Sequence, residues 1–228
     1  MSRLKKIYYI PGDGGIHGQL LQNNGFQGSS PNLTAYKAIG DVDISLDADH
    51  PVSNAINASL QVSVPPFASG FVGFANTGYA GIPVEQATYN NSFWMMGDYD
   101  GTITVQLVGS ESGIVYSGSH NLTVQSTADK FKRFELSFNS SAAPNGNNEW
   151  RVLFDASKVK GALNFGLVEL FPPTYKNRPN GLRNDVASFL AETKPTFLRI
   201  PGGNNLYVLP SCFLSIVIEE CWLTCWLQ

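Results

Sequence analysis

Apolar and polar residues alternate along five separate stretches in the middle of the chain. These stretches are residues 59–64, 102–107, 121–124, 133–138 and 149–154. A period of two puts neighbouring side chains on opposite faces of a strand, so each stretch predicts a β-strand with one buried face. Turn-forming residues separate the stretches, and no helical pattern comes between them. The pattern therefore predicts a β-sandwich over about residues 29–172.

A different pattern follows this β-rich body. Four apolar residues recur at the spacing of one helix face: Leu182, Val186, Phe189 and Leu190. Lys194-Pro195 predicts the end of that helix, and residues 196–200 have the pattern of a strand that ends at Pro201-Gly202-Gly203. Helix, loop, strand and glycine-rich loop form the unit of a parallel α/β barrel. Near the start of the chain, residues 16–24 are also expected to be helical.

Composition and charge narrow the class of protein. Charged residues make up 14% of the chain and the net charge is −3, whereas soluble domains average about a quarter charged. Low charge with many Gly, Asn, Ser and Thr residues is typical of extracellular β-rich proteins. No basic run is long enough to attract phosphates, which excludes nucleic acid as a partner.

The end of the chain differs from the rest in composition. All three cysteines lie there: Cys212, Cys221 and Cys225. A disulfide framework for the main body is therefore excluded, and without a histidine this tail predicts no metal site. The tail is apolar but short for a membrane span and carries Glu219 and Glu220, so no membrane partner is expected. We interpret residues 207–228 as an aberrant product of an unspliced intron or a frame error, with a true hydrophobic terminal helix as the alternative.

Two observations on the sequence bear on whether the protein is secreted, and they point in opposite directions. The apolar stretch that follows the basic residues 1–6 is too short for the hydrophobic region of a signal peptide, so no signal peptide is expected in this chain. Five Asn-x-Ser/Thr acceptor sites are nevertheless compatible with secretion. They lie at Asn32, Asn57, Asn90, Asn121 and Asn139.

Three longer motifs resemble the family 51 α-L-arabinofuranosidases of the fungal type. Residues 12–28, GDGGIHGQLLQNNGFQG, resemble the opening of these glycoside hydrolases. Residues 165–183, FGLVELFPPTYKNRPNGLR, are similar to the segment that leads those enzymes back into their catalytic barrel. Residues 197–206, FLRIPGGNNL, resemble their second barrel strand and its loop. The resemblance covers about residues 12–206.

The resemblance implies a fold that agrees with the patterns above. In this family a β-sandwich is inserted after the first strand and helix of a (β/α)8 barrel. We expect a mainly β chain, with a jelly-roll sandwich like a carbohydrate-binding module and flanking pieces of an incomplete (β/α)8 barrel. Four segments are expected: 1–28, the start of the barrel; 29–172, a galactose-binding-like sandwich; 173–206, a barrel helix and strand; and 207–228, the aberrant tail.

The resemblance also implies an activity. Family 51 enzymes remove terminal non-reducing α-L-arabinofuranosyl groups from arabinoxylan and arabinan with retention of configuration, which needs two carboxyl groups about 5–5.5 Å apart. Both are glutamates on later barrel strands, expected beyond Leu206. The chain is thus expected to be a truncated, inactive form without a catalytic residue or cofactor. Its partner would be an arabinose-containing plant polysaccharide, and its location extracellular by family.

Two substrate-binding residues follow from the resemblance. Arg199 would support the site with its rigid guanidinium, and Asn204 would hydrogen-bond the arabinose. The alternatives are a structural ion pair for Arg199 and a turn position for Asn204. The family also has an acidic sugar contact before its Gly-Asp-Gly-Gly motif. Residues 7–11 are Ile-Tyr-Tyr-Ile-Pro here, so that contact is expected to be missing.

A non-catalytic carbohydrate-binding sandwich is the alternative function. Three aromatic residues are candidate sugar-stacking platforms or, alternatively, core residues: Trp94, Tyr99 and Trp150. Glu169 lies among apolar residues and is expected to be a paired or rim carboxylate rather than a catalytic one. The three histidines are too scattered along the chain to form a Ser-His-Asp triad.

Overall fold

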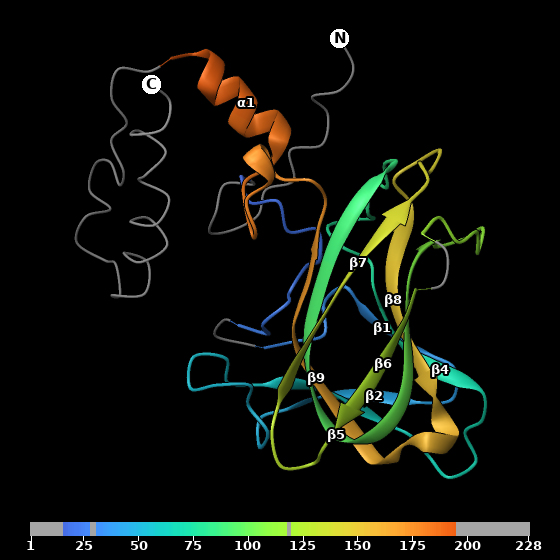
Figure 1. Ribbon diagram of the computed structural model, residues 1–228. Helices are drawn as coiled ribbons and strands as arrows, with labels where there is room; N and C mark the ends of the chain where they lie inside the picture. Colours follow the sequence, from blue (N-terminus) through green and yellow to red (C-terminus); the bar gives the residue numbers. More distant parts are fainter. Residues whose placement is uncertain (1–15, 28–30, 118–119, 195–228) are drawn as a thin grey trace.

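Two antiparallel sheets face each other in the computed structural model, which describes residues 16–27, 31–117 and 120–194 (Figure 1). The strands are β1 (Tyr36–Ile39), β2 (Asp43–Asp47), β3 (Ser59–Ser63), β4 (Phe71–Asn76), β5 (Ala87–Gly109), β6 (His120–Ser126), β7 (Lys132–Ser140), β8 (Asn148–Asp155) and β9 (Lys160–Phe171). One sheet has the order β1-β4-β8-β5-β6 and the other the order β7-β5-β9-β3-β2. The expected β-sandwich is confirmed, and β5 belongs to both of its sheets.

Strand β5 joins the sheets because it bends in its middle. Its first half pairs with β7 and β9, and its second half pairs with β6 and β8. Gly97 lies between the two halves with φ 127°, a backbone conformation that residues with a side chain rarely adopt. The carbonyl oxygen of Ala162 would lie only 2.7 Å from a Cβ at this position. The bend therefore requires glycine both for conformation and for space.

Aromatic side chains from both sheets fill the space between them. Trp150, Phe74 and Phe154 from one sheet meet Phe93 and Phe165 from the other, and all five are fully buried. The rings of Phe74 and Phe165 pack edge to face with centroids 4.9 Å apart. Such pairs add to the stabilisation that each large side chain gains from leaving water.

The segment before the sandwich is not helical, so the helix expected over residues 16–24 is wrong. The chain is extended here and then turns, with Asn23 at φ 59°. Backbone amides of Gly18 and Leu20 instead donate to the carbonyls of Gly181 and Leu170, each over 3.0 Å. A nine-residue helix containing Gly and two Asn residues is marginal alone, so these long-range hydrogen bonds outcompete it.

The helix expected near residue 182 is confirmed and begins two residues later. Helix α1 (Asn184–Glu192) follows the short 3-10 turn η2 (Tyr175–Asn177) and lies beyond one end of the sandwich (Figure 1). A second 3-10 turn, η1 (Ala156–Lys158), joins β8 to β9. Within the described ranges, no helix has the length and apolar character needed to cross a bilayer. The strand expected over residues 196–200 lies outside the described residues.

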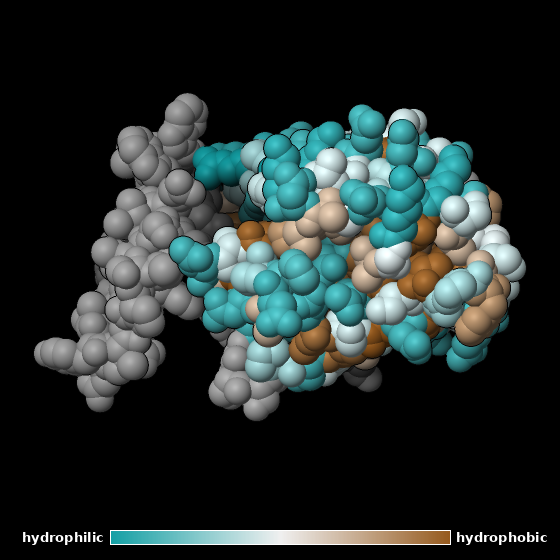
Figure 2. Space-filling view, turned by 90° about the horizontal axis from the view of Figure 1, so that it is seen from below, coloured by the Kyte–Doolittle hydropathy of each residue, from teal (hydrophilic) through white to brown (hydrophobic). Residues whose placement is uncertain are grey.

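The surface of the sandwich is mixed in character. In the end-on view of Figure 2, hydrophobic residues reach the surface in separate small areas between hydrophilic ones. Phe67 and Phe71 are its most exposed large apolar side chains. Scattered exposure of this kind is ordinary for a soluble domain and does not by itself indicate a binding face.

Candidate functional site

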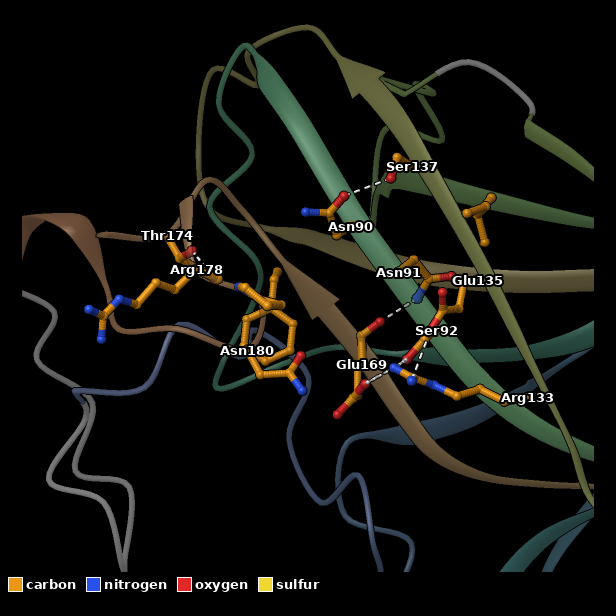
Figure 3. A pocket seen from close by; sticks show the side chains of 13 residues that line it. Asn90, Asn91, Ser92, Arg133, Glu135, Ser137, Glu169, Thr174, Arg178 and Asn180 are labelled. Carbon is orange, nitrogen blue, oxygen red and sulfur yellow. Dashed lines mark hydrogen bonds and ion pairs between the residues drawn. The ribbon is translucent and has the colours of Figure 1, made fainter. Parts of the chain in front are cut away.

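A pocket of about 410 Å³ opens on the outer face of β7, β5 and β9, next to the segment that follows β9 (Figure 3). Its lining side chains come from Asn90, Asn91 and Ser92 in β5, from Arg133, Glu135, Leu136 and Ser137 in β7, and from Glu169 and Phe171 in β9. Thr174, Arg178, Pro179 and Asn180 close the remaining side. This volume lies in the range of small-molecule sites.

Strand register explains why these residues meet. Asn90 pairs with Ser137, and Ser92 pairs with both Glu135 and Glu169. Because alternate residues of a strand point to opposite faces, the neighbours Tyr89 and Phe93 are turned into the core. The polar residues are thus brought together on the outer face.

One guanidinium organises the charged part of the pocket. Arg133 lies 2.9 Å from Glu135 Oε1 and 3.5 Å from Glu169 Oε2, and its Nη2 donates to Ser92 Oγ over 3.3 Å. Ser92 Oγ in turn donates to Glu169 Oε2 over 2.5 Å. The expectation that Glu169 is a paired carboxylate is confirmed.

Unused hydrogen-bonding capacity remains in the neutral part of the pocket. Ser137 Oγ donates to Asn90 Oδ1 over 2.6 Å and so fixes its amide, whose nitrogen has no partner among the described residues. Asn91 is 3% exposed, and its amide nitrogen donates to the carbonyl of Glu169. Within the same described part of the chain, Asn91 Oδ1 has no donor. The pocket therefore offers the amide nitrogen of Asn90 as a donor at a fixed position, whereas the enclosed Asn91 Oδ1 is out of reach of a ligand.

A second polar cluster surrounds the carboxylate of Asp47 at the end of β2. It accepts from His50 Nδ1 over 2.7 Å, Gln61 Nε2 over 2.9 Å and Asn164 Nδ2 over 2.8 Å, and from the backbone amides of Asp49 and His50. Burial alone would raise the pKa of Asp47, but these hydrogen bonds outweigh burial and lower it. We interpret the cluster as an anchor for the loop after β2.

This anchor predicts a stability that depends on pH. The pKa of Asp47 is lower in the folded chain than its unfolded value of about 3.9, so its contribution is present above that value and lost as the pH falls through the folded pKa. We expect Asp47→Asn to lower the free energy of unfolding by about 2 kcal/mol at neutral pH. Urea unfolding of both proteins from pH 7 to pH 3 should show this difference shrinking. A difference independent of pH would contradict the assignment.

The structure separates the three aromatic candidates. Tyr99 and Trp150 are 2% and 0% exposed and belong to the core, so they cannot stack on a sugar. Trp150 packs against Phe74, and Tyr99 against Phe154. Trp94 is half-buried on the outer face of β5, opposite Arg133. Of the three, only Trp94 remains a candidate.

Other residues singled out in the sequence do not join the pocket as a site. His17 packs on Phe171, His50 binds Asp47, and His120 stacks on Phe138, so the histidines lie apart. No group of three or more His, Cys, Asp or Glu side chains that could hold a metal occurs among the described residues. Arg199, Asn204 and the positions beyond Leu206 lie outside these residues.

Comparison with known proteins shows similarity to curated fungal proteins. No protein-family model matches it. It is 50% identical over 196 residues, 86% of its length, to α-L-arabinofuranosidase A of Aspergillus kawachii. It is 56% identical over 157 residues, 68% of its length, to the probable α-L-arabinofuranosidase A of Emericella nidulans. The chain spans about 31% of the first relative and 28% of the second.

A solved structure agrees with these relatives. An arabinose-bound family 51 α-L-arabinofuranosidase superposes with a TM-score of 0.76 at 40% sequence identity. The match covers 88% of this chain and 34% of that one. Sequence and structure therefore both align this chain with about a third of the same kind of protein.

Proposed function

We propose that this chain, a homologue of about a third of the fungal family 51 α-L-arabinofuranosidases, belongs to an enzyme that hydrolyses terminal non-reducing α-L-arabinofuranosides. The observation that carries the proposal is the 50% identity over 196 residues, supported by the 40% identity to the arabinose-bound structure. Hydrolysis would proceed with retention, through one carboxyl group that protonates the leaving oxygen and another that attacks the anomeric carbon.

The catalytic pair is proposed to lie outside residues 16–194. Glu135 and Glu169 are the two carboxylates that line the described pocket, and both pair with Arg133. Retaining hydrolysis requires the two carboxyl groups to differ, one protonated and one ionised, and a shared guanidinium does not separate them in this way. Substrate contacts by Arg199 and Asn204 are proposed on the resemblance alone.

The course of the chain supports a sandwich inserted into another module. Residues on either side of the sandwich meet: His17 pairs with Leu182, and Arg183 N donates to Ile16 O over 2.9 Å. Both sides contain the motifs that resemble barrel sequence. We therefore propose that residues 1–28 and 173–206 belong to one catalytic barrel and residues 29–172 to the sandwich.

The substrate is proposed to be arabinoxylan or arabinan outside the cell. Four of the five glycosylation acceptors lie outside the pocket and are exposed: Asn32, Asn57, Asn121 and Asn139. Exposure is what N-glycan attachment requires, so it supports a secreted glycoprotein.

A chimaera tests the proposed function. Residues 16–194 of this chain would replace the homologous third of the Aspergillus kawachii enzyme, and release of 4-nitrophenol from its α-L-arabinofuranoside would be measured. We expect the chimaera to retain activity and the 228-residue chain alone to release none. A folded but inactive chimaera would contradict the shared function, and release by the chain alone would contradict the placement of the catalytic pair.

A further inference from the structure

We propose that the pocket between β7, β5, β9 and residues 174–180 binds a neutral sugar residue of a polysaccharide. The inference rests on the proposed function only for the class of ligand. Its own basis is the geometry of the pocket, which combines polar side chains of fixed orientation, an Asn90 amide donor without a partner among the described residues, and balanced charge.

Polar groups of fixed orientation converge on this pocket from two neighbouring strands. Glu169 is held by Ser92 and Arg133, and Asn90 is held by Ser137. Sugar hydroxyls both donate and accept hydrogen bonds, so they match a carboxylate acceptor beside an amide donor. Because these side chains are already ordered, binding requires little loss of their rotamer freedom.

The buried amide of Asn91 ties β5 to β9 beside Glu169 and does not itself meet a ligand. Its nitrogen is engaged by the carbonyl of Glu169, and its oxygen has no donor among the described residues. That oxygen is enclosed on the side of β5 that carries the core residues Tyr89 and Phe93, so it is a structural group and not a contact for the ligand. Figure 3 shows Asn91 beside Ser92 and Glu135 in the wall of the pocket.

Charge balance argues for a neutral ligand over an anion. The lining holds two arginines and two glutamates. Arg133 is shared by both glutamates, and Arg178 points away from the strands in Figure 3. A phosphate or uronate would meet the carboxylates of Glu135 and Glu169, whose shared guanidinium is already engaged by them.

Apolar side chains complete the match to a sugar. Phe171 forms part of the lining and is fixed by the edge of His17, with ring centroids 5.1 Å apart. Leu136 and Pro179 lie in the same lining. Ten of the thirteen lining residues are polar or charged, which suits the hydroxyls of a sugar ring, and these three apolar residues offer contacts to its carbon-bound hydrogens.

Affinity electrophoresis tests the proposal with the 228-residue chain, made in a host that attaches no N-glycans. We expect gels containing soluble arabinoxylan to retard the chain and gels containing dextran to leave its mobility unchanged. Asn90→Ala and Glu169→Gln should each weaken binding about tenfold. Asn121→Ala is the matched control, because Asn121 is also an exposed strand residue that accepts from a cross-strand hydroxyl, that of Thr104, but in the other sheet. It should bind as the unaltered chain does.

Thermal unfolding would establish that each variant is folded. Ser137→Ala is a milder second variant, because it removes only the hydroxyl that orients Asn90, and should weaken binding about threefold. Retardation that none of these variants changes would overturn the inference, as would no retardation at all. If the chimaera hydrolyses arabinofuranosides while the chain binds no polysaccharide, the inference fails and the proposed function stands. If the chain binds polysaccharide while the folded chimaera is inactive, the proposed function fails and the inferred sugar site stands.

Discussion

Replacing Arg151 by methionine is expected to lower the free energy of unfolding by about 3 kcal/mol, because it leaves a buried carboxylate without one of its cationic partners. Glu149 in β8 is fully buried on the outer side of its sheet. Its Oε1 lies 2.7 Å from Arg151 Nε, and its Oε2 lies 2.5 Å from Lys37 Nζ of β1. Without Arg151, the Oε1 atom of this carboxylate loses its charged hydrogen-bond donor at a position that water does not reach. Urea unfolding at neutral pH would measure the change.

The double variant Glu149→Met with Arg151→Met makes this prediction specific. It removes the buried carboxylate that Arg151→Met leaves without its arginine partner. Of the three charged groups only Lys37 remains, and its side chain is 47% exposed and can turn to solvent. The double variant should therefore be more stable than Arg151→Met alone, by about 1 kcal/mol or more. If adding Glu149→Met lowered stability further, loss of side-chain packing and not the buried charge would be the main effect.

Replacing Gly97 by alanine should be comparably damaging, by about 3 kcal/mol, and for a different reason. A side chain at φ 127° is strained, and its Cβ would press on the backbone carbonyl of Ala162. The bend has little freedom to relax, since Gly97 N donates to Thr127 O and Gly97 O accepts from Ser126 Oγ. Thermal and urea unfolding would both report the loss.

Gly161→Ala is the matched control for this substitution. Gly161 also has a positive φ, 90°, but no atom lies within 4 Å of a Cβ built there. It should therefore show only the conformational cost, about 1–2 kcal/mol. Equal losses at the two positions would mean that the close approach of β9 contributes nothing.

Strands that alternate clearly in sequence, such as β7, could be predicted, whereas β4 and the first half of β5 could not. β7 alternates between exposed and buried residues along most of its length, so its pattern is visible. β4 is buried from Val72 to Asn76, and the first half of β5 contains the buried run Asn91–Phe93. Covering both faces removes the period of two, and the boundaries of these strands then depend on partners far along the chain.

The pocket was beyond prediction for a related reason. Ser92 meets Arg133 and Glu169 across 41 and 77 residues of sequence. The contacts exist because β5 lies between β7 and β9, and a chain read alone does not reveal that strand order. Residues 90–92 are Asn-Asn-Ser, a run without alternation, so the sequence indicated neither which of them face outward nor which strands would join them. The family motifs identified related proteins, whereas the residues that meet in the pocket could be identified only from the folded structure.

The double membership of β5 also determines how the sandwich comes apart. Residues 90–92, 94 and 95 of this strand pair with both β7 and β9, and residues 103–105 pair with both β6 and β8, so these stretches have no free edge. Neither sheet can detach without breaking the strand that the other also needs. We therefore expect the sandwich to unfold as a single cooperative unit, with the amides of these doubly paired stretches exchanging with solvent hydrogen only when the whole domain opens.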